Sequence, residues 1–467
     1  MSPLSAASRV LSAVVPGACL LVGWTADATS GPMRTCVSPP RYPSPSPTRP
    51  RYSLQVRLQP AARLATGDLR VRFTPDLPTD RLVFRLWANA PISLREGTRL
   101  TASDVHSSRG PLTLTRPDPT TLVARPRTPL AAGQAIVVTL RWRLRLPYQT
   151  RDRNDAAPQS VRLGSFFPIL AWEPGHGWAR DPAPRNLAES AMSPIADFDL
   201  RITAPTELRI FASGVERGRG HWVARAVRDV AVTAGHFRVV SRTVSVPQPV
   251  RLTVALQNAG GGPIPDLSRP FAQRGSAEQY LSTGAAALRT LARLYGPYPW
   301  PSLTAVVERD ASPTGGIEYP TLVYLGYESL VTAVAHEFAH QWFYSLVGND
   351  QGRDPWLDEG LASWAQTEVD PGAKSYFLNA PLTRGAKHHL GASMSYWNQH
   401  LADYRVGVYA QGVQALAALG PSADVDCGLR NYVARNAYGI ATQADLIRDV
   451  SAQIPAAKRI LNSFGVS

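Results

Sequence analysis

The first half of the chain is dominated by segments in which apolar and polar residues alternate. The alternation is clear in residues 51–58 and 69–73, and it returns in residues 197–202. A longer run, residues 135–146 (AIVVTLRWRLRL), is rich in residue types that favour β-strands. Clusters of Pro and Gly separate these segments, as expected for turns between strands. The pattern predicts a largely β domain over residues 51–245.

The second half of the chain shows helical periodicity instead. Apolar residues recur at helical spacing in residues 276–294, and this segment ends at a Gly-Pro pair. A short strand is expected at 303–308, and helices dominate after Ser329. Because 467 residues are too many for one ordinary core, we expect a second, mainly helical domain over residues 246–467.

The composition narrows the class of partner. The hydrophobic fraction of 44% is that of a globular protein. The formal net charge is +14, and all but three of the 49 basic residues are arginine. These arginines are scattered along the chain, whereas a nucleic-acid-binding protein would carry them in a stripe or in a recognisable module. We therefore expect no nucleic-acid partner, while attraction to an acidic cell envelope stays open.

The N-terminus has the features of a signal peptide, which we assign to residues 1–28. Arg9 precedes an apolar run at 11–24 that is too short to span a bilayer comfortably. The Ala-Asp-Ala segment at 26–28 fits the small-x-small pattern of a cleavage site. Residues 29–50 are rich in Pro and Ser, and we expect them to form an extended linker.

This leader predicts a secreted or envelope-associated protein with no membrane span after its removal. Two alternatives stay open, namely a lipid anchor at Cys19 and a disordered cytosolic leader. Cys36 and Cys427 would remain in the mature chain. Export would permit a disulfide between them, but the sequence leaves open whether they pair.

A metal-binding motif (HEFAH) occupies residues 336–340, inside an apolar stretch at 330–347 that is expected to be helical. Residues four apart share one face of a helix, so His336 and His340 can present two imidazole nitrogens to one cation. Glu337 is placed to face a metal-bound water without binding the metal. Zinc lowers the pKa of such a water to roughly 7. A carboxylate can then take the proton and deliver it to the leaving amine.

The third metal ligand is expected in residues 356–362 (WLDEGLA), which begin another helix. Eighteen residues separate His340 from Glu359, enough to bring Glu359 back from an adjacent helix. Two His and one Glu form a typical catalytic zinc site. Taken alone, Glu359 would be an ordinary glutamate in the first turn of a helix. In this pairing we predict one zinc ion per chain, held by His336, His340 and Glu359.

HEFAHQW and WLDEGLA at this spacing resemble the gluzincin peptidases of the aminopeptidase N family. Three further segments are similar to that family, namely YGPYPW (295–300), GGIEY (315–319) and YAQG (409–412). The resemblance covers roughly residues 51–450. It implies a β-rich saddle or sandwich domain followed by a thermolysin-like, mainly helical zinc peptidase domain. It also implies a short form without the family's helical C-terminal domain, and hence a more open cleft.

The resemblance assigns roles to residues outside the metal motif. Glu318 would bind the free α-amine of a peptide, and the backbone at Gly315 and Gly316 would pair with the substrate as an added strand. Tyr409 would donate a hydrogen bond to the oxyanion that forms during hydrolysis. From the residues alone, Glu318 would be a solvated strand carboxylate and Tyr409 a helix-packing aromatic.

Several positions depart from the family pattern. Tyr319 and Asp358 each stand where Asn is usual, and Gln411 stands in place of Lys. Gln366 occupies a position where a carboxylate is common. Weaker support of metal ligands typically costs about 10–100-fold in metal affinity or activity. For the family's second amine anchor, Glu173 is a weak candidate.

The sequence therefore predicts a zinc metallopeptidase that acts on peptides, with release of N-terminal residues as the expected specificity. Two alternatives stay open. One is a secreted zinc endopeptidase, and the other is a weakly active peptide-binding envelope protein with the same fold. Neither the side-chain preference nor the oligomeric state follows from the sequence.

Overall fold

The computed structural model describes residues 36, 41–148, 153–185, 192–258, 274–309, 315–327 and 330–467. The predicted signal peptide, Cys19 and much of the predicted linker lie outside the described residues. All of the described residues belong to one compact unit, Cys36–Ser467. Among them, no helix has the length and apolar character needed to cross a membrane.

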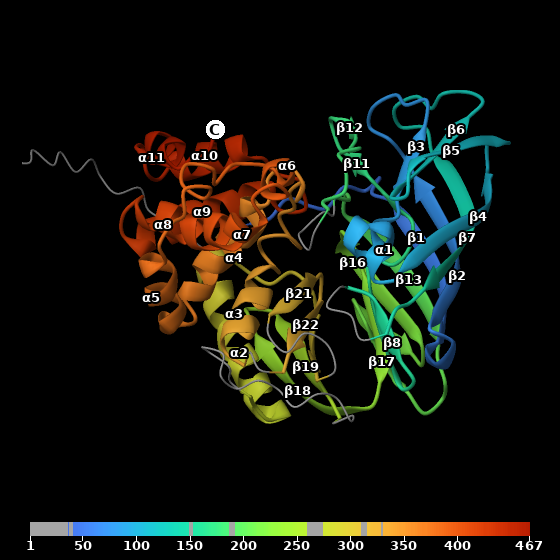
Figure 1. Cartoon of the computed structure of the whole chain (residues 1–467), viewed down its shortest axis with the longest axis horizontal. Helices are drawn as coiled ribbons and strands as arrows, with labels where there is room; N and C mark the ends of the chain where they lie inside the picture. Colours follow the sequence, from blue (N-terminus) through green and yellow to red (C-terminus); the bar gives the residue numbers. More distant parts are fainter. Residues whose placement is uncertain are drawn as a thin grey trace, which may run out of the picture. The chain divides into compact units, whose positions relative to one another are not determined.

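A seven-stranded sheet forms the body of the first half, in the order β15-β16-β13-β1-β2-β7-β4 (Figure 1). Its strands are β1 (Arg51–Gln59), β2 (Leu64–Phe73), β4 (Arg99–Ser107), β7 (Ile136–Arg145), β13 (Ala196–Thr203), β15 (Val215–Gly218) and β16 (His221–Val227). Every second residue of β1 is buried. Leu54, Leu69 and Leu140 face one another across three strands and are fully buried. The alternating segments of the sequence thus form this sheet, because one face of each strand packs into the core.

Three smaller sheets complete the first half, in the orders β10-β3-β6-β5, β14-β17-β9-β8 and β11-β12. Their strands are β3 (Leu82–Arg85), β5 (Leu112–Asp118), β6 (Thr121–Pro126), β8 (Asp155–Ala157), β9 (Ser160–Gly164), β10 (Ile169–Leu170), β11 (Trp172–Glu173), β12 (Gly177–Trp178), β14 (Arg209–Ala212) and β17 (Ala231–Gly235). The short helical segments η1 (Pro60–Ala62), η2 (Trp87–Asn89) and α1 (Pro91–Arg95) connect strands of this half.

A five-stranded sheet with the order β18-β19-β20-β22-β21 carries the second half. Its strands are β18 (Phe237–Ser245), β19 (Pro249–Gln257), β20 (Ser302–Glu308), β21 (Gly316–Tyr319) and β22 (Leu322–Gly326). Strands β19, β20 and β22 run parallel, and β21 runs antiparallel to β22 at the edge. The sequence assigned β18 to the first domain, but β18 pairs with β19 along its whole length. By sheet membership, β18 therefore belongs to the second half.

Helices cover the second half and gather apart from the strands β1–β17 (Figure 1). They are α2 (Ala277–Tyr295), α3 (Thr332–Ala339), α4 (Trp356–Thr367), α5 (Pro371–Asn379), α6 (Met394–Trp397), α7 (Leu401–Arg405), η3 (Val406–Ala410), α8 (Gln411–Ala417), α9 (Ser422–Asn436), α10 (Gln443–Ser451) and α11 (Ala457–Ser463). Helix α2 begins with a capping box, in which Ser276 accepts from the main chain of Gln279 and the Gln279 side chain accepts in return. It packs on β18, β19 and α3.

The apolar stretch at 330–347 is not one helix, so this prediction was wrong in its extent. Helix α3 ends at Ala339, and His340 is its C-cap. The chain then turns, because the main-chain N–H of Ser345 donates back to the His340 carbonyl and Tyr344 adopts a φ of 131°. The residues after His340 are apolar because they are buried in the core, and a continuous apolar run does not reveal a helix end.

Buried polar contacts join strands of the first half to the five-stranded sheet. Tyr324 donates from its hydroxyl to the carbonyls of Leu163 at 3.2 Å and Val232 at 2.9 Å. The guanidinium of Arg162 lies 2.8 Å from the carboxylate of Glu308, and both side chains are buried. Removing one member of such a pair would leave an uncompensated buried charge. These contacts therefore fix how β9 and β17 lie against the five-stranded sheet.

Cys36 and Cys427 form a disulfide bond with their Cα atoms 5.4 Å apart, which answers the question that the sequence left open. Cys427 lies in α9 beside Asp426. The Oδ1 atom of Asp426 accepts hydrogen bonds from the Tyr295 hydroxyl at 2.9 Å and from the Trp364 indole at 2.8 Å. Asp426 thus connects α9 to α2 and α4, next to the disulfide that joins α9 to Cys36.

Candidate metal centre and active site

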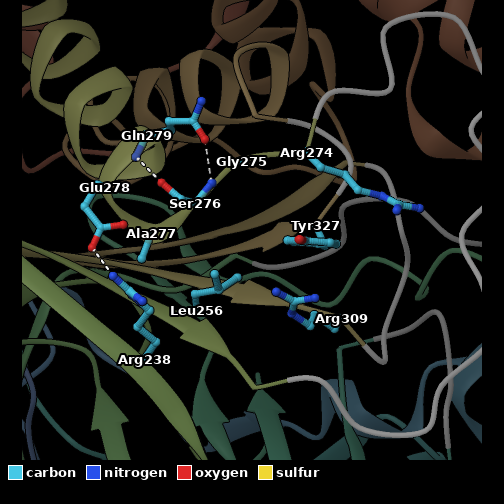
Figure 2. Close-up of a pocket in the computed structure, with 10 residues that line it drawn as sticks. All are labelled: Arg238, Leu256, Arg274, Gly275, Ser276, Ala277, Glu278, Gln279, Arg309 and Tyr327. Atoms are coloured by element: carbon cyan, nitrogen blue, oxygen red, sulfur yellow. Dashed lines mark hydrogen bonds and ion pairs between the residues drawn. The ribbon is translucent and has the colours of Figure 1, made fainter.

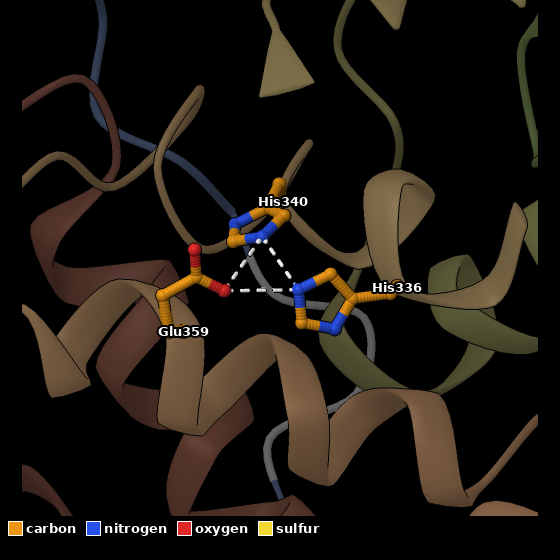
Figure 3. Close-up of side chains that lie close together, drawn as sticks. All are labelled: His336, His340 and Glu359. Atoms are coloured by element: carbon orange, nitrogen blue, oxygen red, sulfur yellow. Dashed lines mark hydrogen bonds and ion pairs between the residues drawn. The ribbon is translucent and has the colours of Figure 1, made fainter. Parts of the chain in front are cut away.

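The three predicted metal ligands converge from two adjacent helices (Figure 3). His336 lies in the last turn of α3, His340 at its C-cap and Glu359 in the first turn of α4. The Nε2 atom of His336 is 2.9 Å from Oε2 of Glu359 and 3.1 Å from Nε2 of His340. Nε2 of His340 is 3.5 Å from the same Glu359 oxygen. Three ligand atoms thus surround one point.

Hydrogen-bond acceptors beside the Nδ1 atoms of both imidazoles fix the tautomer that metal binding requires. Nδ1 of His336 lies 3.1 Å from the Gln366 side-chain oxygen. Nδ1 of His340 lies 3.1 Å from the Phe343 carbonyl and 2.7 Å from Oδ1 of Asp358. All of these partners are acceptors, so both Nδ1 atoms carry the proton and both Nε2 atoms offer a lone pair. Two imidazole lone pairs and one carboxylate form a donor set that fits a zinc ion.

The electrostatics of the cluster favour positive charge at the same point. Burial would raise the pKa of Glu359, but the hydrogen bonds of His336 and His340 hold that pKa below its usual range. Burial would lower the pKa of His340, yet Asp358 and Glu359 raise it well above its ordinary value. Burial lowers the pKa of His336. Two buried carboxylates therefore attract positive charge, which a divalent cation supplies.

Glu337 lies next to both the metal cluster and the edge strand. Ligand atoms of Glu318, Glu337 and His340 lie within 4.8 Å of one another. A β-carbon on Gly316 would lie 2.6 Å from Oε1 of Glu337. The carboxylate therefore fills space that only glycine leaves open. Glu337 therefore lies between the predicted metal ligands and β21.

Glu318 lies on the edge strand and is 4% exposed, so it is not the solvated carboxylate that would be expected from the residue alone. Burial raises its pKa. The side-chain amide of Gln351 donates to Oε1 of Glu318 at 3.3 Å and also to Oδ2 of Asp358. Since Asp358 contacts His340, Gln351 connects the predicted amine anchor to a predicted metal ligand. Sequence reasoning missed Gln351, because one glutamine in a loop carries no periodic or motif signal.

Tyr409 lies beside His336, one of the predicted metal ligands. Its ring stacks on the His336 imidazole, with centroids 5.8 Å apart and planes 17° from parallel. It belongs to η3, a π-helical turn between α7 and α8. Such turns shift the side chains that follow around the helix and are frequent at functional sites.

Other residues singled out by the sequence have structural partners instead. Glu173 accepts a hydrogen bond from the guanidinium of Arg353 at 3.1 Å. The side chain of Gln411, the first residue of α8, donates to the carbonyl of Gly407 in the preceding turn η3 at 3.2 Å.

Comparison with known proteins agrees with this geometry. Residues 283–395 match the profile of the "Peptidase family M1 domain". The chain carries a peptidase family M1 domain. This M1 domain includes Glu318, Glu337 and all three predicted metal ligands, whereas Tyr409 follows it.

Curated relatives match this chain over a short region. Aminopeptidase B of Homo sapiens is 33% identical over 101 residues, and aminopeptidase RNPEPL1 of Homo sapiens is 37% identical over 101 residues. Leukotriene A-4 hydrolase of Xenopus laevis is 32% identical over 83 residues. These alignments cover 16–20% of this chain and only 13–14% of the relatives' own lengths.

Solved structures match nearly the whole chain. A mutant M1 zinc metallopeptidase of Deinococcus radiodurans, bound to a Tyr-Ser-Ala substrate, has a TM-score of 0.64 at 18% identity. It covers 93% of this chain and 98% of its own. A two-domain M1 zinc metallopeptidase mutant bound to L-arginine has a TM-score of 0.61 at 17% identity. At these identities the likeness concerns the fold, and it confirms the prediction of a β-rich domain followed by a helical peptidase-type domain.

Proposed function

We propose that the protein is a zinc-dependent peptidase that releases residues from the N-terminus of peptides. The convergence of His336, His340 and Glu359 on one point, with Glu337 beside them, carries this proposal. Two of the relatives are named aminopeptidases, and one structural neighbour binds a tripeptide substrate. Both observations support the proposal.

His336, His340 and Glu359 would hold the zinc ion, one per chain. When bound, such an ion polarises a carbonyl group and makes water acidic enough to react near neutral pH. The chain prepares the site through Gln366 and Asp358, which keep the Nδ1 atoms of both histidines protonated. The ligands are thus oriented before the metal arrives.

Glu337 acts as general base and then as general acid. Its carboxylate takes a proton from the attacking water and delivers it to the departing amine. Tyr409 donates a hydrogen bond to the substrate's carbonyl oxygen as that oxygen gains negative charge. Because this interaction strengthens as the reaction proceeds, it lowers the barrier rather than only binding the substrate.

The edge strand aligns the substrate. Strand β21 has one neighbour, β22, among the described strands, so its other side can pair with an extended peptide. Gly316 lets the backbone approach Glu337, while Gly315 adopts a backbone φ of 88°. Glu318 then receives the α-amine. A buried carboxylate gains more from an ammonium partner than an exposed one, because water screens the pair less.

Reporter peptides with free and N-acetylated termini test this proposal. Wild-type protein is expected to hydrolyse only the free peptides, and Glu337→Gln is expected to abolish the activity. Glu216→Gln, at an exposed position of β15, is a matched control and should retain it. Cleavage of acetylated peptides as fast as free ones would identify an endopeptidase. Zinc binding without turnover of either set would identify a peptide-binding protein.

We also propose that the protein acts outside the cytoplasm. The disulfide between Cys36 and Cys427 supports this proposal, because such bonds persist in oxidising compartments. The signal-peptide features of residues 1–28 point the same way. Mass spectrometry of the protein from its natural host should find a mature chain that begins after residue 28 in the envelope or medium. An intact leader in the cytosolic fraction would contradict export.

A further inference from the structure

Helix α4 places one polar side chain beside the outer nitrogen of each histidine ligand. Asp358, in the first turn of α4, has its Oδ1 atom 2.7 Å from Nδ1 of His340. Gln366, in the last turn, has its side-chain oxygen 3.1 Å from Nδ1 of His336. The two imidazoles therefore meet groups of different charge on α4, a carboxylate beside His340 and a neutral amide beside His336.

The charge of Asp358 is shielded from water. Its side chain is fully buried, and its Oδ2 atom accepts a hydrogen bond from the amide of Gln351, which is also fully buried. Because the surroundings are dry, this charge acts on its neighbours with less screening than a surface charge would. A buried carboxylate is also costly unless a positive group compensates it. Asp358 thus favours a cation on the far side of the His340 imidazole, at Nε2.

The amide of Gln366 supplies no such charge. Its oxygen faces His336, and its Nε2 atom is buried without a hydrogen-bond partner among the described residues. A glutamate has nearly the same shape and would place a second oxygen where this N–H group lies. The position can therefore hold a carboxylate with little change in volume, and the neutral group found there leaves His336 without that support.

We propose that Asp358 is a positioning residue that sets the zinc affinity of this site through His340. An imidazole whose outer N–H group lies against a carboxylate is a stronger metal ligand than one that lies against an amide. His340 is then the better supported of the two histidine ligands, and His336 the weaker. This inference rests on the zinc site of the proposed function and deepens it, but it concerns metal affinity, which is measured without a substrate.

Competition for zinc tests the proposal. The zinc-loaded full chain is dialysed against a series of chelator-buffered zinc concentrations, and the bound zinc is measured by mass spectrometry. Asp358→Asn should weaken zinc affinity about 10–100-fold, because it keeps the shape of the side chain but not its charge. Adding Gln366→Glu to this variant should recover about tenfold or more of the loss, since the new carboxylate supports the other histidine.

Two control variants separate this effect from a general effect of charge. Asp354→Asn removes a carboxylate four residues earlier and keeps an oxygen acceptor for Gln443, so its zinc affinity should equal that of the wild type. Gln279 lies at the exposed start of α2, where its side chain accepts from the main-chain N–H of Ser276 (Figure 2). Gln279→Glu keeps this acceptor and adds a charge that water screens. Added to Asp358→Asn, it should recover no zinc affinity.

Circular dichroism of each variant confirms the fold before zinc is measured. Wild-type zinc affinity in Asp358→Asn would overturn the proposal. It would also be overturned if Gln366→Glu recovered no more affinity in the Asp358→Asn background than Gln279→Glu does, because the loss would then be structural. If the variants followed the expected order while the wild type hydrolysed no peptide, this inference would stand and the proposed function would fail.

Discussion

Gly316 and Glu337 approach each other so closely that a β-carbon on Gly316 would lie 2.6 Å from Oε1 of Glu337. The requirement for glycine here is space. At the neighbouring Gly315 the requirement is different, because its φ is 88° and a β-carbon there would meet nothing within 4 Å. The pair of glycines thus serves two purposes: Gly315 permits a backbone conformation, and Gly316 leaves room for the Glu337 carboxylate.

Gly316→Ala should therefore displace Glu337 while leaving the metal ligands in place. A shift of about 1 Å in a reacting group typically costs on the order of 100-fold in rate, so we expect a loss of that size in kcat. Zinc content should stay at the wild-type level. Steady-state kinetics with a free aminoacyl reporter, together with metal analysis, measures both quantities.

The matched control for this variant is Gly218→Ala, since a β-carbon on Gly218 would meet nothing within 4 Å. Its kcat should equal that of the wild type. If Gly316→Ala hydrolysed the reporter at the wild-type rate, the assigned closeness of β21 and Glu337 would be refuted.

Much of this site followed from the sequence. His336, His340 and Glu359 are predicted from helical spacing and from a motif, and both signals can be recognised without knowledge of the fold. Glu318 and Tyr409 needed the resemblance, because a single carboxylate or aromatic has no pattern of its own. The alternating strands were also predictable, since burial of one face imposes a period of two.

The parts that escaped prediction depend on tertiary contacts. Gln351 became visible only when the loop before α4 brought it against Glu318 and Asp358. The end of α3 at Ala339 was missed because the apolar residues after it are buried in a turn rather than on a helix face. The disulfide partner of Cys36 lies 391 residues away in the sequence, and no local pattern spans that distance.

Gln351→Leu should impair recognition of the substrate's amine. The substitution removes the side-chain amide that donates to both Glu318 and Asp358. Two buried carboxylates then lose this hydrogen bond. Glu318 should then lose its orientation, so KM for free N-termini should rise about tenfold with a smaller change in kcat. Gln351→Asn, which keeps a shorter amide, should recover part of the loss.

A purely structural defect in Gln351→Leu would lower kcat and stability together and leave the KM for the amine unchanged. The exposed Gln399 provides a control, because Gln399→Leu removes only a bond to the main-chain carbonyl of Ser395. Its KM should stay at the wild-type value. A Gln351→Leu enzyme with unchanged KM would contradict the positioning role.

Asp426 should make stability depend on pH. Burial raises its pKa from 3.8 to about 6. Below about pH 3.8 the carboxyl is neutral in both the folded and the unfolded chain. As the pH rises toward 6, the unfolded chain releases the proton before the folded chain does. The contribution of Asp426 to the free energy of unfolding therefore falls across this window and is constant above it.

Asp426→Asn removes this titration and keeps an Oδ1 acceptor for Tyr295 and Trp364. The stability of the variant relative to the wild type should rise by up to about 3 kcal/mol between pH 3.5 and pH 7. Urea unfolding at a series of pH values measures this difference. A flat difference for Asp426→Asn would show that its carboxyl is not held neutral by burial.

Zinc content tests the central claim most directly, namely that His336, His340 and Glu359 form one metal site. Mass spectrometry of the metal in freshly purified protein should find about one zinc ion per chain in the wild type. Glu337→Gln should retain the zinc, because Glu337 is not a ligand, whereas Glu359→Gln should lose most of it. Folded wild-type protein without zinc, or equal zinc in Glu359→Gln, would contradict the assignment.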